Sequence, residues 1–287
     1  MRCRFWPVLL LMLLSACAVR RGVDVAPITH PAALSYASHI GIVYTPDGWP
    51  ETLKGDLYYP DTGPEIARPA VLLIHGGAWL GGYRFEMLHI AQALAQRGYV
   101  AFSIDYRLAP EHPYPAALDD VRVALKWLDA HADEYDIDRG RLVLWGYSSG
   151  AQLAGMVAAA LPPDTPPIAA AVLGAIPADL VKLGGHGPER LFIGEPMEDA
   201  KKLYVEASPL ARINEHSVPM FLYHGTWDWL ISDDNSKDMY TGLRALGVPV
   251  ELYLQRGTGH FTTFLLDRGP LHAALDFLDD QLDVAKP

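Results

Sequence analysis

Short apolar runs alternate with amphipathic stretches along most of the chain, which predicts strands and helices in turn. Several of these runs are hydrophobic at every position, as is typical of parallel strands that are covered on both faces. We expect eight strands, at residues 39–44, 53–59, 71–75, 99–104, 142–145, 169–174, 220–224 and 250–254.

Amphipathic helices are expected between these strands. Residues 87–94 and 118–128 carry apolar side chains at helical spacing, and residues 271–282 predict a closing helix. The turn-rich residues 45–52 join the first two strands and favour an antiparallel start. The later alternation implies right-handed crossovers. The sequence therefore predicts a doubly wound, mostly parallel α/β sheet, with its ligand site at the carboxyl ends of the strands.

A glycine-framed turn with two adjacent serines, GYSSG at residues 146–150, lies between a predicted strand and an alanine-rich helix. In a G-x-S-x-G elbow the central serine occupies a strained turn that lifts its hydroxyl above the sheet. Counting from Gly146 makes Ser148 the candidate nucleophile. Ser149 begins the helix, so we expect its backbone N–H, and not its hydroxyl, to face the reacting carbonyl.

The sequence HGGAW at residues 75–79 ends a buried strand. Consecutive glycines let the backbone approach a ligand, and their N–H groups can form a cradle for an anion. A phosphate loop is disfavoured, because no Lys-Ser/Thr pair and no G-x-G-x-x-G spacing is present. The loop resembles the His-Gly-Gly oxyanion loop of esterases, which implies that Gly76 and Gly77 donate to an oxyanion together with Ser149. Ala78 is the competing donor for one of the two glycines.

An acid and a base follow two later strands at their carboxyl ends, Asp228 in HGTWD and His260 in GTGH. A serine hydroxyl becomes a strong nucleophile when an imidazole removes its proton, and a carboxylate fixes the tautomer of that imidazole. The order serine, aspartate, histidine along the chain is that of α/β-hydrolases. Asp179 is the main alternative acid, and Asp233 and Asp234 are further rivals.

Five stretches together resemble the α/β-hydrolase branch of hormone-sensitive-lipase-like carboxylesterases, feruloyl and acetyl esterases and kynurenine formamidases; they are HGGAW, DYRLAPEHPYPAALDD, GYSSGAQLA, HGTWD and GTGH. The resemblance covers residues 38–283 and implies an acyl-enzyme on Ser148. It also leads us to expect that Arg107 and Glu111 brace the oxyanion loop. Only a short segment precedes the first strand, in place of a large helical cap, and Ala78 replaces the third glycine of the loop. Both departures favour the capless feruloyl/acetyl-esterase and formamidase side.

These observations predict a serine carboxylesterase that acts on short-chain or aryl carboxylic esters of small molecules. An arylformamidase and an oligopeptidase-type serine peptidase remain the alternatives. Trp79, Tyr147 and Trp229 adjoin the motifs and are expected to line the substrate pocket. Residues 177–209 look irregular and predict either a small lid or a surface loop. No H-E-x-x-H or similar spacing occurs, so we expect neither a metal nor another cofactor.

The N-terminus departs from the strand and helix pattern and is typical of a secretory signal peptide. Arg2 and Arg4 precede an apolar run at residues 8–14, which is shorter than the ~20 residues of a membrane-spanning helix. The run leads into LSAC, which resembles the lipobox of bacterial lipoproteins and implies that Cys17 is acylated after cleavage. Ala18 in place of an aspartate then implies the periplasmic side of the outer membrane. An ordinary signal peptide with an incidental Cys17 is the alternative.

Three segments are therefore expected: a signal peptide at 1–16, a lipidated N-terminus and tether at 17–37, and an α/β-hydrolase catalytic domain at 38–287. The 287 residues, half of them hydrophobic, suit one domain with a large core. The formal net charge of -11 would repel phosphate backbones, so nucleic acid is not an expected partner. The membrane is an expected partner only through the lipid anchor.

Overall fold

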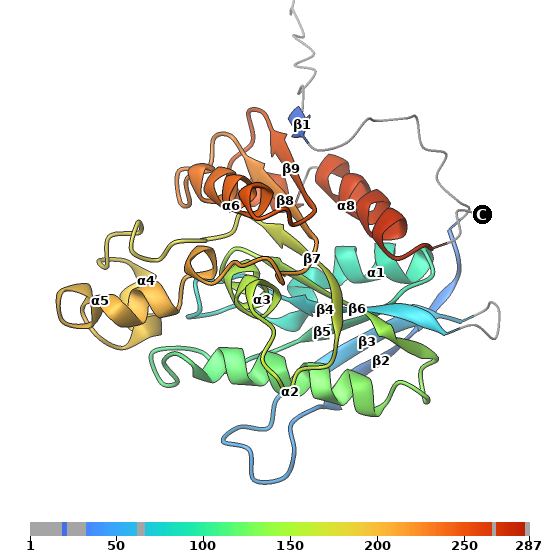
Figure 1. Ribbon diagram of the computed structural model, residues 1–287. Coiled ribbons are helices and arrows are strands. Elements are labelled where there is room, and N and C mark those ends of the chain that lie inside the picture. The colour runs from blue at the N-terminus through green and yellow to red at the C-terminus, as the bar shows by residue number, and fades with distance from the viewer. Residues whose placement is uncertain (1–18, 22–32, 62–66, 266–267, 285–287) are drawn as a thin grey trace, which may run out of the picture.

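A nine-stranded sheet forms the centre of the molecule (Figure 1), as a computed structural model describes it for residues 19–21, 33–61, 67–265 and 268–284. The expected signal peptide and Cys17 lie outside the described residues. The strands are β1 (Val19–Arg21), β2 (Tyr36–Val43), β3 (Lys54–Pro60), β4 (Arg68–Ile74), β5 (Val100–Ile104), β6 (Ile137–Tyr147), β7 (Ile168–Gly174), β8 (Met220–Gly225) and β9 (Val250–Gln255).

The strand order is β1-β9-β8-β7-β6-β4-β5-β3-β2. The neighbours from β5 through β4, β6, β7 and β8 to β9 all pair in parallel. Both β2 and β5 pair antiparallel with β3, and β1 pairs antiparallel with β9. The prediction of a mostly parallel α/β sheet with an antiparallel start is thus confirmed, and the α/β-hydrolase topology brings the ends of β4, β6, β8 and β9 to one edge.

The ninth strand is β1, which lies in the segment where we expected only a tether. Its three residues have no apolar period of their own, and they become a strand because Val19 to Arg21 pair with Leu254 to Leu252 of β9. The Arg20 Nε atom also donates to Glu251 Oε2 at 2.8 Å. This strand is therefore a product of long-range pairing and not of local sequence pattern.

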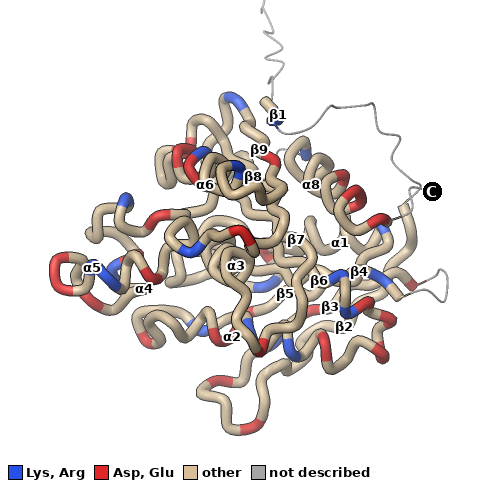
Figure 2. Tube along the Cα trace, viewed as in Figure 1, with Lys and Arg blue, Asp and Glu red and all other residues tan. Residues whose placement is uncertain are grey.

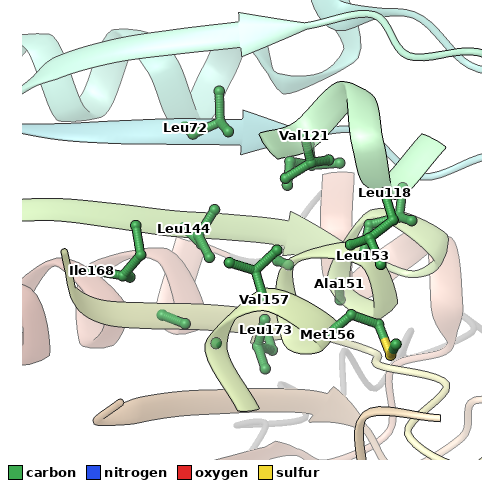
Figure 3. Close-up of a cluster of buried hydrophobic side chains, with 14 of the residues drawn as sticks. Leu72, Leu118, Val121, Leu144, Ala151, Leu153, Met156, Val157, Ile168 and Leu173 are labelled. Atoms are coloured by element: carbon green, nitrogen blue, oxygen red, sulfur yellow. The ribbon is translucent and has the colours of Figure 1, made fainter. Parts of the chain in front are cut away.

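Helices cover both faces of the sheet (Figure 1). One face carries α1 (Leu88–Gln96) and α8 (Arg268–Gln281), and the other carries α2 (Ala116–Ala130), α3 (Ser149–Ala159) and α6 (Asp234–Ala245). Figure 3 shows the second of these layers, where Leu72 and Leu144 of the sheet face Val121 of α2 and Val157 of α3. Each side chain of this kind contributes roughly 1.5–3 kcal/mol when it leaves water, so this packing fixes the strand ends that carry the site.

The stretch 177–209 contains two helices and not the irregular chain that we expected. They are α4 (Pro188–Ile193) and α5 (Met197–Glu206). Pro188 suits the first position of a helix, and Gly194 ends α4 with a φ of 88°, which favours glycine. The buried Phe192 ring stacks on Trp79 at 4.6 Å between centroids. This contact anchors the segment beside the loop that follows β4.

Residues 105–120, which form the stretch DYRLAPEHPYPAALDD, support the oxyanion loop through a residue other than the two that we expected. The Arg107 guanidinium donates through Nε to both carboxylate oxygens of the fully buried Asp120, at 2.9 and 3.0 Å, and Glu111 is exposed. The prediction that Arg107 and Glu111 brace the oxyanion loop is therefore wrong. Tyr106 does so instead, because its ring stacks on His75 at 4.3 Å and its hydroxyl donates to the His75 carbonyl at 3.1 Å.

Acidic positions are spread over several surface elements, among them α5, α6 and α8 (Figure 2). They agree with the formal net charge of -11 over the whole chain. Of the helices that the structure describes, none has the length and hydrophobicity to cross a membrane.

Candidate active site

The turn between β6 and α3 presents Ser148 in a conformation that non-glycine residues rarely adopt, with φ 53° and ψ −122°. The start of α3 packs so closely against its own strand and against the end of β4 that neither glycine beside the serine has room for a side chain. A Cβ atom on Gly146 would lie 2.2 Å from the Gly150 carbonyl oxygen, and one on Gly150 would lie 2.1 Å from the Ile74 carbonyl oxygen. The two glycines therefore make the sharp turn possible, and the turn holds the serine hydroxyl above the sheet.

The structure brings Ser148, His260 and Asp228 together in one hydrogen-bonded chain. The His260 Nε2 atom lies 2.9 Å from Ser148 Oγ, and its Nδ1 atom lies 2.6 Å from Asp228 Oδ2. Because the carboxylate can only accept, Nδ1 carries the proton and Nε2 is free to accept one from the hydroxyl. The ring is thus held in the tautomer that a general base needs.

Asp228 is the carboxylate that orients this imidazole, and its surroundings keep it ionised. Its Oδ1 atom accepts the backbone N–H groups of Leu230 and Ile231 at 3.0 and 2.9 Å. Burial raises the pKa of Asp228, but the hydrogen bonds from His224, His260 and Ile231 outweigh burial and hold that pKa well below its usual range. A charged partner for the developing imidazolium is therefore built into the site.

His224 is a residue of the site that the sequence analysis missed. It is fully buried, and its Nε2 atom lies 2.9 Å from the Ile231 carbonyl oxygen and 3.3 Å from Asp228 Oδ2. Its Nδ1 atom lies 2.7 Å from Ser236 Oγ. Since a carbonyl can only accept, Nε2 carries the proton and faces the carboxylate with it. His224 lies inside the apolar run MFLYHG, so no signal in the sequence pointed to this role.

The loop after β4 places backbone donors beside the nucleophile. The His75 Nδ1 atom donates to the Gly76 carbonyl oxygen at 2.6 Å, which turns the N–H of Gly77, on the other side of the same planar peptide, away from His75. Burial lowers the pKa of His75 to about 4, so the ring is neutral at physiological pH. A Cβ atom on Gly77 would lie 2.0 Å from the Gly81 carbonyl oxygen, so the tight turn requires glycine there.

The N–H groups of Gly77, Ala78 and Ser149 donate no hydrogen bond to any part of the chain that the structure describes. All three residues, together with Gly76, line the same cavity as Ser148. The expected donors Gly76, Gly77 and Ser149 are thus grouped around the nucleophile, and Ala78 remains available as the competing donor. Such a group of unoccupied donors can hold a negatively charged oxygen.

A cavity of about 1030 Å³ opens over the nucleophile. Its wall is largely apolar and comes from the oxyanion loop, α1, residues 177–209, the loop after β8 and α7 (His260–Leu265). Because residues 177–209 border the cavity, they are named the lid segment. The lining side chains that the sequence analysis did not select include Phe85, Leu88, His89, Leu183, Glu189, Leu230, Ile231, Phe264 and Leu265. They come from segments far apart in the chain, so only the fold brings them together.

Two of the three predicted pocket residues line this cavity. Trp79 and Tyr147 form part of its wall, and the Tyr147 hydroxyl also donates to the His260 carbonyl oxygen at 2.5 Å. Trp229 is 82% exposed and is not among the lining residues. The reason is the turn around Asp228: its carboxylate binds the next backbone N–H groups, so Leu230 and Ile231 face the cavity and Trp229 faces solvent.

The rival acids lie elsewhere. Asp179 accepts the backbone N–H of Val181 at 3.0 Å, and Asp233 accepts a hydrogen bond from Lys237 at 2.8 Å. Asp234 pairs with the same lysine at 3.1 Å. Among the described residues, no group of three or more histidine, cysteine, aspartate or glutamate side chains could hold a metal ion.

The chain is similar to one known protein family and to curated proteins that are named esterases. The sequence model described as BD-FAE matches residues 55–243. Esterase LipC of Mycobacterium tuberculosis is 29% identical over 217 residues, which cover 69% of this chain and 54% of LipC. A probable isoprenylcysteine alpha-carbonyl methylesterase, ICMEL1 of Arabidopsis thaliana, is 29% identical over 245 residues, which cover 77% of this chain and 50% of that protein. The chain thus spans about half the length of these curated relatives.

Solved structures share the fold. A truncated carbohydrate esterase from gut microbiota superimposes with a TM-score of 0.77 at 20% identity, covering 88% of this chain and 99% of that one. Thermogutta terrifontis esterase 2, phosphonylated by sarin, superimposes with a TM-score of 0.72 at 25% identity, covering 90% of this chain and 98% of that one. These likenesses agree with the α/β-hydrolase topology of the sheet.

Proposed function

The chain belongs to the BD-FAE family, and from this premise we propose that it is a serine carboxylesterase acting on short-chain or aryl carboxylic esters. The observation that carries the proposal is the hydrogen-bonded chain from Ser148 through His260 to Asp228, which faces a largely apolar cavity. The esterase names of the curated relatives support it.

The reaction follows from the geometry of the site. The Ser148 hydroxyl attacks the ester carbonyl carbon while His260 Nε2 takes its proton. The carbonyl oxygen becomes negatively charged and is held by the backbone N–H groups of Gly77, Ser149 and either Gly76 or Ala78. The imidazolium then protonates the departing alcohol, which leaves an acyl group on Ser148. A water molecule then attacks the acyl carbonyl carbon and gives a proton to His260. The imidazolium passes that proton to the departing Ser148 Oγ atom, which releases the carboxylic acid and restores the serine.

A panel of substrates tests this proposal against an arylformamidase and a peptidase. We expect p-nitrophenyl esters with acyl chains of two to four carbons to be hydrolysed with a higher kcat/KM than the decanoate. We also expect N-formylkynurenine and a peptide anilide to react at least about tenfold more slowly than the best ester, because the discrimination of a shaped site is of this order or larger. A preference for N-formylkynurenine would replace the esterase by the formamidase, and a preference for the decanoate would contradict a short acyl chain.

We propose further that the protein is held in a bacterial cell envelope by a lipid on Cys17, most simply at the periplasmic side of the outer membrane. The support is the apolar run at residues 8–14 followed by LSAC. On expression in a bacterium with two membranes, the wild type should incorporate radiolabelled palmitate and sediment with membranes. The Cys17→Ala variant should do neither. Equal membrane association of the two proteins would contradict the lipid anchor.

A further inference from the structure

A carboxylate that the mechanism does not use lines the cavity. Glu189 in the lid segment is only 2% exposed, and it borders the same space as Ser148 and His260. Its Oε1 atom accepts the backbone N–H of Gly187 at 2.9 Å. Its Oε2 atom has no hydrogen-bond partner, and no basic side chain pairs with Glu189, in the part of the chain that the structure describes.

The backbone around this carboxylate is shaped to hold it. Gly187 also lines the cavity, and a Cβ atom there would lie 2.6 Å from Glu189 Oε2. Any other residue at position 187 would therefore push the carboxylate away from its place. The carboxylate thus lies directly against the Gly187 backbone, with Oε1 bound to its N–H and Oε2 beside its Cα.

Among the described lining residues, the rest of the cavity wall provides no lysine or arginine to neutralise this carboxylate. A second carboxylate, Glu86, lines the same space. The aromatic rings of Phe85 and Phe261 are also part of the wall. Withdrawing a carboxylate from water without a cation is unfavourable, and a cation that enters the cavity removes this cost. Aromatic faces attract cations as well, whereas two carboxylates repel an anion.

From these contacts we infer that the cavity selects esters that carry a positively charged group, such as a quaternary ammonium, and that Glu189 is the specificity-determining residue that binds the cation. The inference rests on the proposed esterase function and adds a substrate class to it. Ester substrates with a carboxylate in the same place are rejected for the same electrostatic reason.

Pairs of esters with one shape and two charges test the inference. Acetylcholine and 3,3-dimethylbutyl acetate differ only in nitrogen against carbon in the alcohol part. The p-nitrophenyl esters of 4-(trimethylammonio)butyric acid and 5,5-dimethylhexanoic acid place the same difference in the acyl part. The readout is the ratio of kcat/KM for the charged to the neutral ester, measured for the wild type, Glu189→Gln and Glu198→Gln.

We expect Glu189→Gln to lower this ratio about tenfold or more in at least one pair, the effect of a cation near a buried carboxylate. Glutamine keeps the acceptor for the Gly187 N–H, so the lid segment should retain its fold. Glu198→Gln removes an equal charge from an exposed position of the same segment and should leave the ratio unchanged. Equal ratios in the wild type and Glu189→Gln for both pairs would overturn the inference.

Binding of a non-reacting cation gives a second readout that does not need turnover. Tetramethylammonium should inhibit hydrolysis of the neutral ester competitively in the wild type, and calorimetric titration should detect its binding. Absence of binding to the wild type would overturn the inference. The esterase function is judged separately, by whether neutral esters are hydrolysed and whether that activity depends on Ser148. If no neutral ester reacts, the proposed function fails, and the calorimetric result alone decides on the cation site.

Discussion

Replacing Ser148 with alanine is expected to lower kcat on p-nitrophenyl acetate by about 10⁵–10⁶-fold. The hydroxyl is the atom that His260 Nε2 contacts at 2.9 Å, and alanine removes the group that would carry the acyl intermediate. The oxyanion donors and the cavity remain, so a small residual rate over water should persist. Initial rates with the purified variant, corrected for spontaneous hydrolysis, measure the effect.

The matched control for this variant is Ser149→Ala. Ser149 contributes its backbone N–H to the site, and its hydroxyl lies 3.4 Å from the Tyr106 hydroxyl, inside the protein. Removing that hydroxyl keeps the N–H donor, so we expect less than about a tenfold loss, in line with a modest internal hydrogen bond. If Ser149→Ala were the inactive variant and Ser148→Ala the active one, the assignment of the nucleophile would be reversed.

Asp228→Asn is expected to lower kcat by about 10⁴-fold, the size known for this replacement in other serine hydrolases of this mechanism. Asparagine has nearly the same shape but can present an N–H to His260 Nδ1, which favours the wrong tautomer of the ring. It also removes the charge that stabilises the imidazolium. Rates across a pH series should remain low at every pH, because protonation of the ring does not restore the missing charge.

In the wild type, the pKa of Asp228 is held well below its usual range, so this carboxylate stays ionised as the pH falls through the ordinary carboxyl range. A loss of wild-type activity between pH 7 and pH 5 should therefore not arise from protonation of Asp228. Asp179→Asn is the control, because Asp179 binds the Val181 N–H instead of His260. A loss of activity in Asp179→Asn that matches that of Asp228→Asn would reopen the choice of acid.

The fold could be predicted from the sequence to the extent that each element carries its own pattern. The eight strands from β2 to β9 lie within or close to the predicted apolar runs. The signal is clearest for the central parallel strands, because they are hydrophobic on both faces. The short strand β1 escaped prediction because its stability comes from pairing with β9, far away in the sequence. Helix α4 escaped because its short run lies among glycines and prolines, and its packing depends on the contact of Phe192 with Trp79.

The candidate site shows the same division between local and long-range information. Glycine spacing marks the serine turn and the oxyanion loop, since both need close backbone approach that only glycine permits. The direction of a side chain on a loop, in contrast, could not be predicted from the local sequence. Trp229 points to solvent because hydrogen bonds to Asp228 set the turn, and His224 and Glu189 join the site only through contacts with distant segments.

The antiparallel pairing of β1 with β9 also bears on whether copies of the protein aggregate through the edge of the sheet. The outer edge of a terminal strand offers unsatisfied N–H and C=O groups to any passing chain, and other copies of the protein are the nearest candidates. Residues 19–21 occupy part of that edge and place two arginines on it. A protein that lacks residues 1–21 would keep every catalytic group. It would, however, expose the edge of β9, to which a strand of another copy could pair.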